Sequence, residues 1–264
     1  MRKVVNVVLV IAALLVASTM AMAEAINPFN TRPVEPCFGG NGEYGGCTVP
    51  GETSLQGVLN NLSLGSIDVV SDQQTAGVWQ LAGSLPGQIG PVLRVEYAGY
   101  YDANVFGLWT QYDTTTVRAM LPIFWGPANP DCAASVYFGT NGSIKITDTS
   151  FDCPAGEVNE GLFSNIGINP RFFGFYLDNG HGNTFYTADQ LNGGHPQALT
   201  YRAAASDTWV IAFEDLPYDG ADRDFQDQVV TVESIVPVPE PATLTLLGTG
   251  LIGLAGLVRR KLKK

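Results

Sequence analysis

The sequence predicts an all-β protein: a β-sandwich or jelly-roll-like body between an N-terminal signal peptide and a single C-terminal membrane helix. Three observations support this prediction. Short runs rich in β-branched and aromatic residues recur about every 8–12 residues between turn signals. No long segment of the body places apolar residues at helical spacing. Both ends of the chain carry uncharged apolar stretches next to basic residues.

The first residues have the three parts of a secretory signal peptide. A basic start is followed by an apolar core over residues 4–16 and by the small-residue motif AMA. We therefore expect cleavage between Ala23 and Glu24, removal of residues 1–23, and export across the inner membrane. A retained membrane anchor is the alternative, and the short apolar core disfavours it.

Residues 24–57 are rich in Pro, Gly and Asn and predict an irregular leader outside the core. The leader contains Cys37 and Cys47, and the body contains Cys132 and Cys153. An even number of cysteines in an exported protein indicates disulfides. Of the three possible pairings we favour the local one, 37–47 with 132–153, and each bridge would add roughly 3 kcal/mol. The absence of CxxC spacing disfavours a zinc site.

The body, residues 58–236, consists of strand-like runs separated by turns. The pair of runs around Asp102-Ala103 predicts a hairpin, and Asn141-Gly142 predicts a second hairpin with a type I′ turn. No fixed-period repeat is present, which argues against a solenoid or propeller. The predicted runs cover residues 66–70, 77–81, 91–101, 104–110, 135–139, 143–147, 171–177, 197–203, 208–213 and 228–236.

The segment FEDLPYDGADRDFQDQ, between the last two predicted strands, crowds six acids into fourteen positions. At ~6 Å, each unscreened carboxylate pair costs about 0.7 kcal/mol even in bulk water. Calcium takes about six to eight oxygen ligands, and Gly220 would let the backbone fold around an ion, although the EF-hand spacing is absent. We therefore predict a calcium site; the alternative is a solvated turn in which Arg223 pairs with one acid. The predicted ligands are Glu214, Asp215, Asp219, Asp222, Asp224 and Asp227.

Residues 165–235 also resemble a bacterial extracellular family known as domain of unknown function 4114. The likeness is carried by "EDLP" at 214–217 and by "DRDFQD" at 222–227, where the family usually has DxDFND. Gln226 replaces the usual Asn. The resemblance implies a secreted β-sandwich module of surface and matrix proteins, and it strengthens the expectation of calcium.

At the C-terminus, Val238, Pro239, Glu240 and Pro241 precede 17 uncharged residues, 242–258, and five of the last six residues are basic. The uncharged stretch is just long enough for a membrane helix, and the basic end should stay cytoplasmic. The arrangement resembles the PEP-CTERM sorting signal of Gram-negative bacteria. It implies that an exosortase, a membrane transpeptidase-like enzyme, recognises residues 237–264 as partner. It also implies transient anchoring in the inner membrane, removal of the tail, and a final location at the cell surface or in the extracellular matrix.

Charge restricts the partners of the exported body. Without the two basic residues of the signal peptide and the five of the tail, 7 Lys or Arg face 25 Asp or Glu, a net charge of about −18. Nucleic acid and anionic membrane surfaces are therefore poor partners for the body, and divalent cations and neutral polymers are better ones.

No catalytic residue is predicted, and we expect no enzyme. The two histidines, His181 and His195, lie in Gly/Asn-rich turns, and no GxSxG motif is present. A polysaccharide-binding, lectin-like module is the main alternative to a non-enzymatic matrix or biofilm protein, because exposed aromatic rings stack on sugars. A glycan hydrolase with paired carboxylates is a weaker one. The four tryptophans, Trp79, Trp109, Trp125 and Trp209, fit either sugar stacking or a sandwich core.

Overall fold

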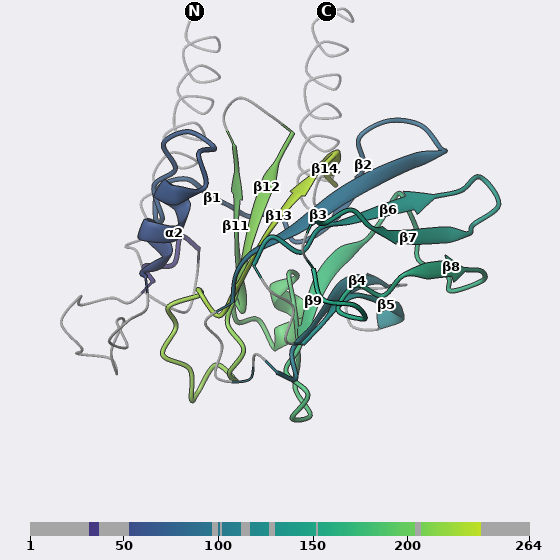
Figure 1. The fold of residues 1–264 in the computed structure, drawn as a ribbon. Coiled ribbons are helices and arrows are strands. Elements are labelled where there is room, and N and C mark those ends of the chain that lie inside the picture. Colours follow the sequence, from purple (N-terminus) through teal and green to yellow (C-terminus); the bar gives the residue numbers. More distant parts are fainter. Residues whose placement is uncertain are drawn as a thin grey trace, which may run out of the picture.

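Two antiparallel sheets packed face to face form the body of the chain in the computed structural model (Figure 1). The structure describes residues 32–36, 53–96, 100, 102–111, 117–126, 130–151, 153–203 and 207–238. Within these residues the all-β sandwich prediction is confirmed. Side chains of both sheets share one core, in which Phe106 of the smaller sheet meets Phe213 of the larger with ring centroids 6.2 Å apart.

The larger sheet has eight strands in the order β1-β11-β12-β13-β3-β6-β7-β8, and the smaller has four in the order β10-β9-β4-β5. A separate pair joins β2 (Trp79–Leu81) to β14 (Ile235–Pro237). The strands of the larger sheet are β1 Gln73–Gln74, β3 Gly87–Glu96, β6 Ala134–Phe138, β7 Ile144–Asp148, β8 Gly161–Phe163, β11 Ala198–Arg202, β12 Trp209–Phe213 and β13 Gln228–Glu233. Those of the smaller are β4 Val105–Gln111, β5 Val117–Trp125, β9 Gly174–Asp178 and β10 Thr184–Tyr186.

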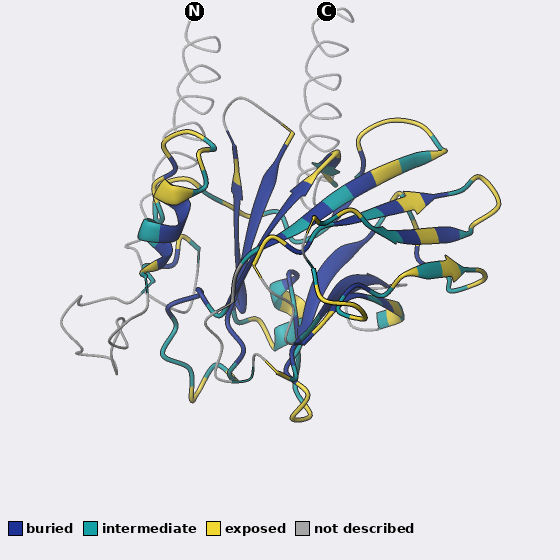
Figure 2. Cartoon of the chain, viewed as in Figure 1, coloured by how far each residue is buried: buried dark blue, intermediate teal, exposed yellow. Residues whose placement is uncertain are grey.

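Strands β11, β12 and β13 are covered on both faces. One face joins the sandwich core, and the other packs against helix α2 (Leu55–Asn61), which begins after the capping residue Ser54. Every residue of β12 is therefore buried, and its sequence WVIAF shows no apolar–polar alternation. Figure 2 shows these strands almost wholly in the colour of buried residues.

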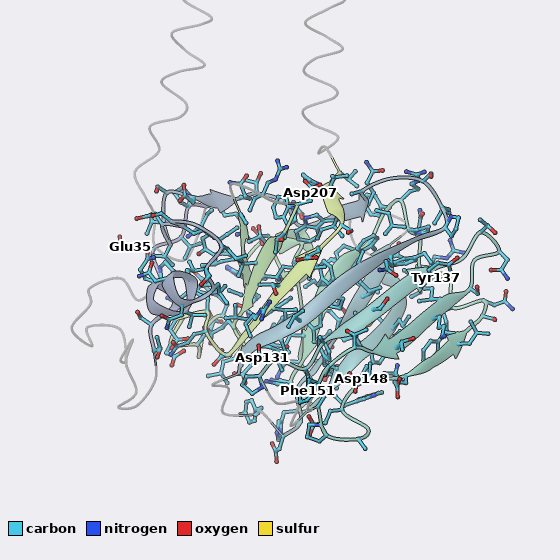
Figure 3. All side chains as sticks on the ribbon, turned by 45° about the horizontal axis from the view of Figure 1, so that its top comes forward. Glu35, Asp131, Tyr137, Asp148, Phe151 and Asp207 are labelled. Atoms are coloured by element: carbon cyan, nitrogen blue, oxygen red, sulfur yellow. A yellow bond between two sulfur atoms is a disulfide. The ribbon has the colours of Figure 1, made fainter. Side chains whose placement is uncertain are left out.

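The outer face of β3, β6, β7 and β8 remains open. There the burial alternates along β6 and β7, and the exposed Tyr137 of β6 pairs in register with Lys145 of β7, which in turn pairs with Leu162 of β8. Figure 3 shows Tyr137 on this surface. The alternation follows the period of two expected for a half-buried sheet.

The prediction that residues 24–57 lie outside the core is wrong for the described part of that segment. Val34 and Leu55 are buried in the cluster beneath α2. The Pro/Gly-rich composition indicated irregular backbone, but the outer face of β11–β13 requires apolar cover from outside the sheet, and this segment provides part of it. Run 66–70 is irregular and enters a turn at residue 69 rather than forming a strand, and its Ile67 packs in the same cluster.

The expected hairpin around Asp102-Ala103 is also wrong, because β3 and β4 belong to different sheets. The second hairpin, β6–β7, is confirmed, with a different turn. Gly139 N–H donates to Ser143 O, and in this turn Gly142 alone has a positive φ, of 77°. This geometry fits a type I turn followed by a left-handed glycine rather than type I′. The long run 228–236 splits at Ser234, with φ 65°, into β13 and β14.

Several predicted features lie outside the described residues: the signal peptide with Ala23 and Glu24, Cys37, Cys47, and residues 239–264. In the part of the chain that the structure describes, no helix has the length and apolar character needed to cross a membrane.

Candidate metal centre

The loop between β12 and β13 brings five of its six predicted ligands together (Figure 1, yellow-green loop between β12 and β13). Carboxylate oxygens of Glu214, Asp222 and Asp224 lie within 4.8 Å of one another, and so do those of Glu214, Asp215 and Asp227. Asp219 belongs to neither group and is exposed at the tip of the loop. The prediction of a common acidic cluster thus holds for all members except Asp219.

Backbone contacts fix the start of the loop. Glu214 N–H donates to Gln197 O at 3.1 Å, which continues the β11–β12 pairing, and Asp215 N–H donates to Asp227 Oδ2 at 2.8 Å. The second bond joins the two ends of the loop directly. Asn179, which follows β9 in the smaller sheet, donates through Nδ2 to Asp215 O at 2.9 Å. The cluster therefore sits where the ends of both sheets meet.

The second half of the loop is anchored by Phe225. Its ring is buried in the cluster beneath α2, and its φ is 57°, a left-handed conformation that costs on the order of 1–3 kcal/mol for a non-glycine residue. On either side, Asp224 accepts hydrogen bonds from the N–H and the Nε2 of Gln226, at 3.2 and 2.8 Å. Burial of the ring helps to offset the backbone cost and holds Asp224 next to Glu214.

The outer part of the loop is held by Tyr218. The His195 ring stacks on it with centroids 3.9 Å apart, and Arg223 Cζ lies 4.4 Å from the same centroid. Two groups this close to one ring centre must occupy opposite faces. Arg223 Nη2 also donates to Tyr218 O at 2.9 Å. Both faces of the Tyr218 ring are therefore occupied by protein groups, so the ring holds the loop in place and is not free to stack on a sugar.

Glu214 is the most unusual group of the site. Glu214 is 1% exposed, and neither of its carboxylate oxygens has a hydrogen-bond partner within the described part of the chain. Burial raises the pKa of Glu214 well above its ordinary value, and the neighbouring carboxylates, Asp227 first, raise it further. An unsatisfied buried carboxylate is costly unless a cation or a proton compensates it.

Two further carboxyls respond in the same direction. Burial raises the pKa of Asp227 well above its usual range, and the charge of Asp215 adds to this effect. Burial also raises the pKa of Asp215, while a side-chain hydrogen bond with Asn104 and a backbone hydrogen bond from Tyr100 oppose the shift. Ionised together, the carboxylates destabilise one another.

Such a site suits a hard divalent cation. All its candidate ligands are oxygens, and oxygens bound to one calcium ion at about 2.3–2.6 Å lie at most about 5 Å apart. The 4.8 Å limit within each group meets this requirement. The arrangement can hold calcium through carboxylates, with backbone carbonyls and water as further ligands.

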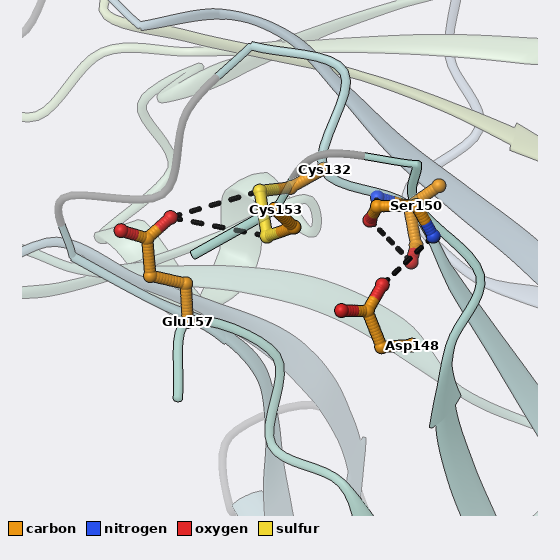
Figure 4. The surroundings of a disulfide bond; sticks show 6 residues. Cys132, Asp148, Ser150, Cys153 and Glu157 are labelled. Atoms are coloured by element: carbon orange, nitrogen blue, oxygen red, sulfur yellow. Dashed lines mark hydrogen bonds between the residues drawn. A yellow bond between two sulfur atoms is a disulfide. The ribbon is translucent and has the colours of Figure 1, made fainter. Parts of the chain in front are cut away.

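The Cys132–Cys153 disulfide is present with the expected local pairing, and it closes a 21-residue separation (Figure 4). Glu157 Oε2 lies 3.7 and 3.8 Å from the two sulfurs. Although these three residues form a compact group, the sulfurs are bonded to each other and are not thiolate ligands. This group is therefore a covalent link and not a metal site.

The remaining candidates for chemistry are dispersed. His181 packs against Tyr100, with ring centroids 4.2 Å apart, whereas His195 stacks on Tyr218. Trp79, Trp109 and Trp209 are buried, and Trp125 is 41% exposed. Three of the four tryptophans thus belong to the interior, as the core interpretation predicts.

Sequence reasoning missed the amides that position the acidic loop. Gln197 donates through Nε2 to Leu216 O at 2.7 Å, and Asn179 holds Asp215. Both amides, together with Asn104, are buried. Asn179 directly follows β9 and Asn104 directly precedes β4, both far from the loop in sequence, and no local pattern marks them.

Residues 237–261 match the family model of the PEP-CTERM protein-sorting motif. The predicted sorting signal is thereby confirmed. It implies export, anchoring through the C-terminal segment, and exosortase as the processing partner. The match begins at Pro237, the last residue of β14, and the N–H of the next residue, Val238, donates to Val78 O at 3.0 Å. The signal therefore begins directly at the β2–β14 pair. No curated protein and no solved structure matches the chain. The resemblance of residues 165–235 to domain of unknown function 4114 stays a prediction.

Proposed function

We propose that the chain is a non-enzymatic protein of the cell surface or extracellular matrix, processed by an exosortase, whose sandwich is stabilised by calcium at the acidic loop. The sorting motif supports export and processing. The observation that carries the calcium assignment is Glu214, a buried carboxylate that has no hydrogen-bond partner among the described residues and that lies close to four other acids.

Electrostatics explains why a cation would stabilise the fold. At 4.8 Å and an effective dielectric constant of about 20, two unit charges repel by about 3.5 kcal/mol. A divalent cation between them replaces this repulsion with attraction. The bound ion would stabilise the larger sheet because the loop joins β12 to β13, and the smaller sheet because Asn179 donates a hydrogen bond to Asp215 O. Calcium would therefore act as a structural link between the sheets.

Thermal unfolding with and without calcium tests the proposal. At a calcium concentration of 100 times Kd, one site adds about 2.7 kcal/mol. For a body of this size the melting temperature should then rise by about 5–11 °C relative to the same protein in EGTA. An Asp219→Asn variant, altered outside the cluster, should respond like the wild type. Equal melting temperatures in calcium and EGTA would contradict the assignment.

Processing is tested separately. The intact mass of the protein recovered from its exporting host should lack the hydrophobic tail, and a Glu240→Ala substitution in the sorting motif should retain it. Glu233→Ala, in an exposed position on β13, is the matched control and should be processed normally. An unprocessed wild-type protein in a host with an active exosortase would refute this part.

The proposal assigns the protein no catalysed reaction. In support, Glu214, Asp215 and Asp224 are buried beneath the loop and do not line an open cleft where a glycan could reach them. Incubation with exopolysaccharide should release no reducing ends. Their release at a rate abolished by Glu214→Gln would favour a glycan hydrolase instead.

A second candidate function, polysaccharide binding, is favoured by a cavity of about 360 Å³ beside the loop. Amide and hydroxyl groups on its wall suit sugar hydroxyls, although Asn192 and Gln197 already hydrogen-bond to the protein backbone. A glycan array with and without calcium tests this function, since specific retention would support it. The cavity is lined by Gly182, Asn183, Thr184, Phe185, Asn192, Gln197, Pro217 and Tyr218.

A further inference from the structure

The clustered carboxylates form two groups of three that share one member, rather than one group of five. Glu214 forms one group with Asp222 and Asp224, and the other group with Asp215 and Asp227. We propose that the loop binds two calcium ions, with the Glu214 carboxylate bridging them. This inference rests on the proposed calcium function and specifies the number of ions and the ligands of each.

The geometry of each group fits one ion. Within a group the oxygens lie within 4.8 Å of one another, which is about twice a calcium–oxygen distance. A single ion in contact with all five carboxylates would require their oxygens to form one such group. Each ion instead takes two aspartates of its own, and water and backbone carbonyls complete its coordination.

Glu214 has the properties of a bridging ligand. It follows β12 directly and is held by the bond from its N–H to Gln197 O. Both of its carboxylate oxygens are buried, and neither has a hydrogen-bond partner among the residues that the structure describes. A monodentate ligand for one ion would leave its second oxygen buried and unsatisfied, whereas a bridge between the two groups uses one oxygen for each ion. Asp224 and Asp227 differ in this respect, because their carboxylates accept hydrogen bonds from the protein.

Charge balance leads to the same number. Five ionised carboxylates carry five negative charges, so one calcium ion would leave three of them uncompensated and two ions would leave one. Three members of the cluster, Glu214, Asp215 and Asp224, are 1–2% exposed. Buried charges must be compensated locally because solvent does not screen them. Two ions therefore match the buried charge much better than one.

Calcium stoichiometry tests the inference. The full chain, kept soluble in a non-ionic detergent, is stripped with EGTA, titrated with calcium chloride by calorimetry, and analysed for bound metal after equilibrium dialysis. The wild type should bind two calcium ions per chain. Asp222→Asn and Asp227→Asn each remove a ligand unique to one group and should each retain one ion. Glu214→Gln should weaken both sites at least tenfold, and Asp219→Asn should retain both.

The outcomes separate this inference from the calcium function itself. One ion in the wild type, lost equally in Asp222→Asn and Asp227→Asn, would overturn the two-ion inference and leave the calcium function intact. No bound calcium in the wild type would overturn both. Circular dichroism checks the fold of each variant. Asp227 Oδ2 accepts a backbone hydrogen bond, so Asp227→Asn perturbs the loop more than Asp222→Asn does. If Asp227→Asn does not fold, the variant of the half-buried Asp222 decides the test.

Discussion

Replacing Glu214 with glutamine should change stability in opposite directions with and without calcium. In EGTA at neutral pH the substitution removes a buried charge from the centre of four other carboxylates, so the variant should be more stable than the wild type. In millimolar calcium it removes a bridging ligand, so the variant should be less stable. Glutamine has nearly the same shape as glutamate, and packing should therefore contribute little to either effect.

The magnitudes follow from the distances in the cluster. One carboxylate pair at 4.8 Å repels by about 3.5 kcal/mol at an effective dielectric constant of about 20, and partial protonation in the wild type relieves some of this cost. We expect a gain on the order of 2 kcal/mol in EGTA, or about 4–8 °C in Tm. In calcium at 100 times Kd, loss of one site alone removes about 2.7 kcal/mol.

Scanning calorimetry at pH 7.5, in EGTA and in excess calcium, measures both effects. Glu233→Gln is the matched control, because Glu233 is exposed at the end of β13 and should change Tm by less than about 2 °C in either buffer. A Glu214→Gln variant that is less stable than the wild type in both buffers would refute the reasoning. Its carboxylate would then have a satisfying partner within the protein.

Three further predictions concern pH, the disulfide and the tryptophans. Without calcium, the free energy of unfolding should fall as pH rises from about 4 through the raised pKa values of Glu214 and Asp227, because the folded state retains protons that the unfolded state has released. Chemical denaturation at several pH values measures this free energy, and an increase with pH would contradict the prediction. Cys132→Ser removes a disulfide across 21 residues and should lower the free energy of unfolding by about 3 kcal/mol, which corresponds to a Tm about 6–12 °C lower. An unchanged Tm would show that the disulfide adds no stability. Trp125→Ala, at a half-exposed site, should lower the free energy of unfolding by about 1 kcal/mol, whereas Trp79→Ala, at a buried site, should lower it by about 3–5 kcal/mol. Equal losses in urea denaturation would contradict the argument from burial.

The strands that could be predicted are those whose sequences are short, uninterrupted apolar runs. WVIAF and QVVTVE are apolar runs of strand length, and they form the doubly covered β12 and β13. The strand β5, with the sequence VRAMLPIFW, was not predicted, because Arg118 and Pro122 interrupt its apolar pattern. The false hairpin at Asp102-Ala103 shows a different limit. Two strand-like runs joined by a short turn look alike whether they pair or, as here, pass from one sheet to the other.

The acidic site was predictable in composition but not in structure. The crowding of acids in one loop was evident, and five of them do converge. Sequence could not distinguish Asp219, which is exposed and outside the cluster, because the loop has acids both before and after it. It also could not show Asn179 or Gln197, because their contacts with the loop arise from the packing of strands distant in sequence.

Burial distinguishes a cation-binding loop from a solvated acidic turn. Carboxylates that point into water cost little to crowd, because water and salt screen them, and such a turn would expose its acids. Among the described acids of the loop, Asp219 behaves in this way, whereas Glu214, Asp215 and Asp224 are almost fully covered. Because they are buried, proton uptake or a bound cation must compensate their charge. Proton uptake compensates it less and less as pH rises through the raised pKa values, whereas a cation does so at neutral pH. The pH dependence of stability with and without calcium therefore tests the central claim directly: the two curves should converge in acid and separate as pH rises, and curves that remain superimposed to pH 8 would leave no role for the metal.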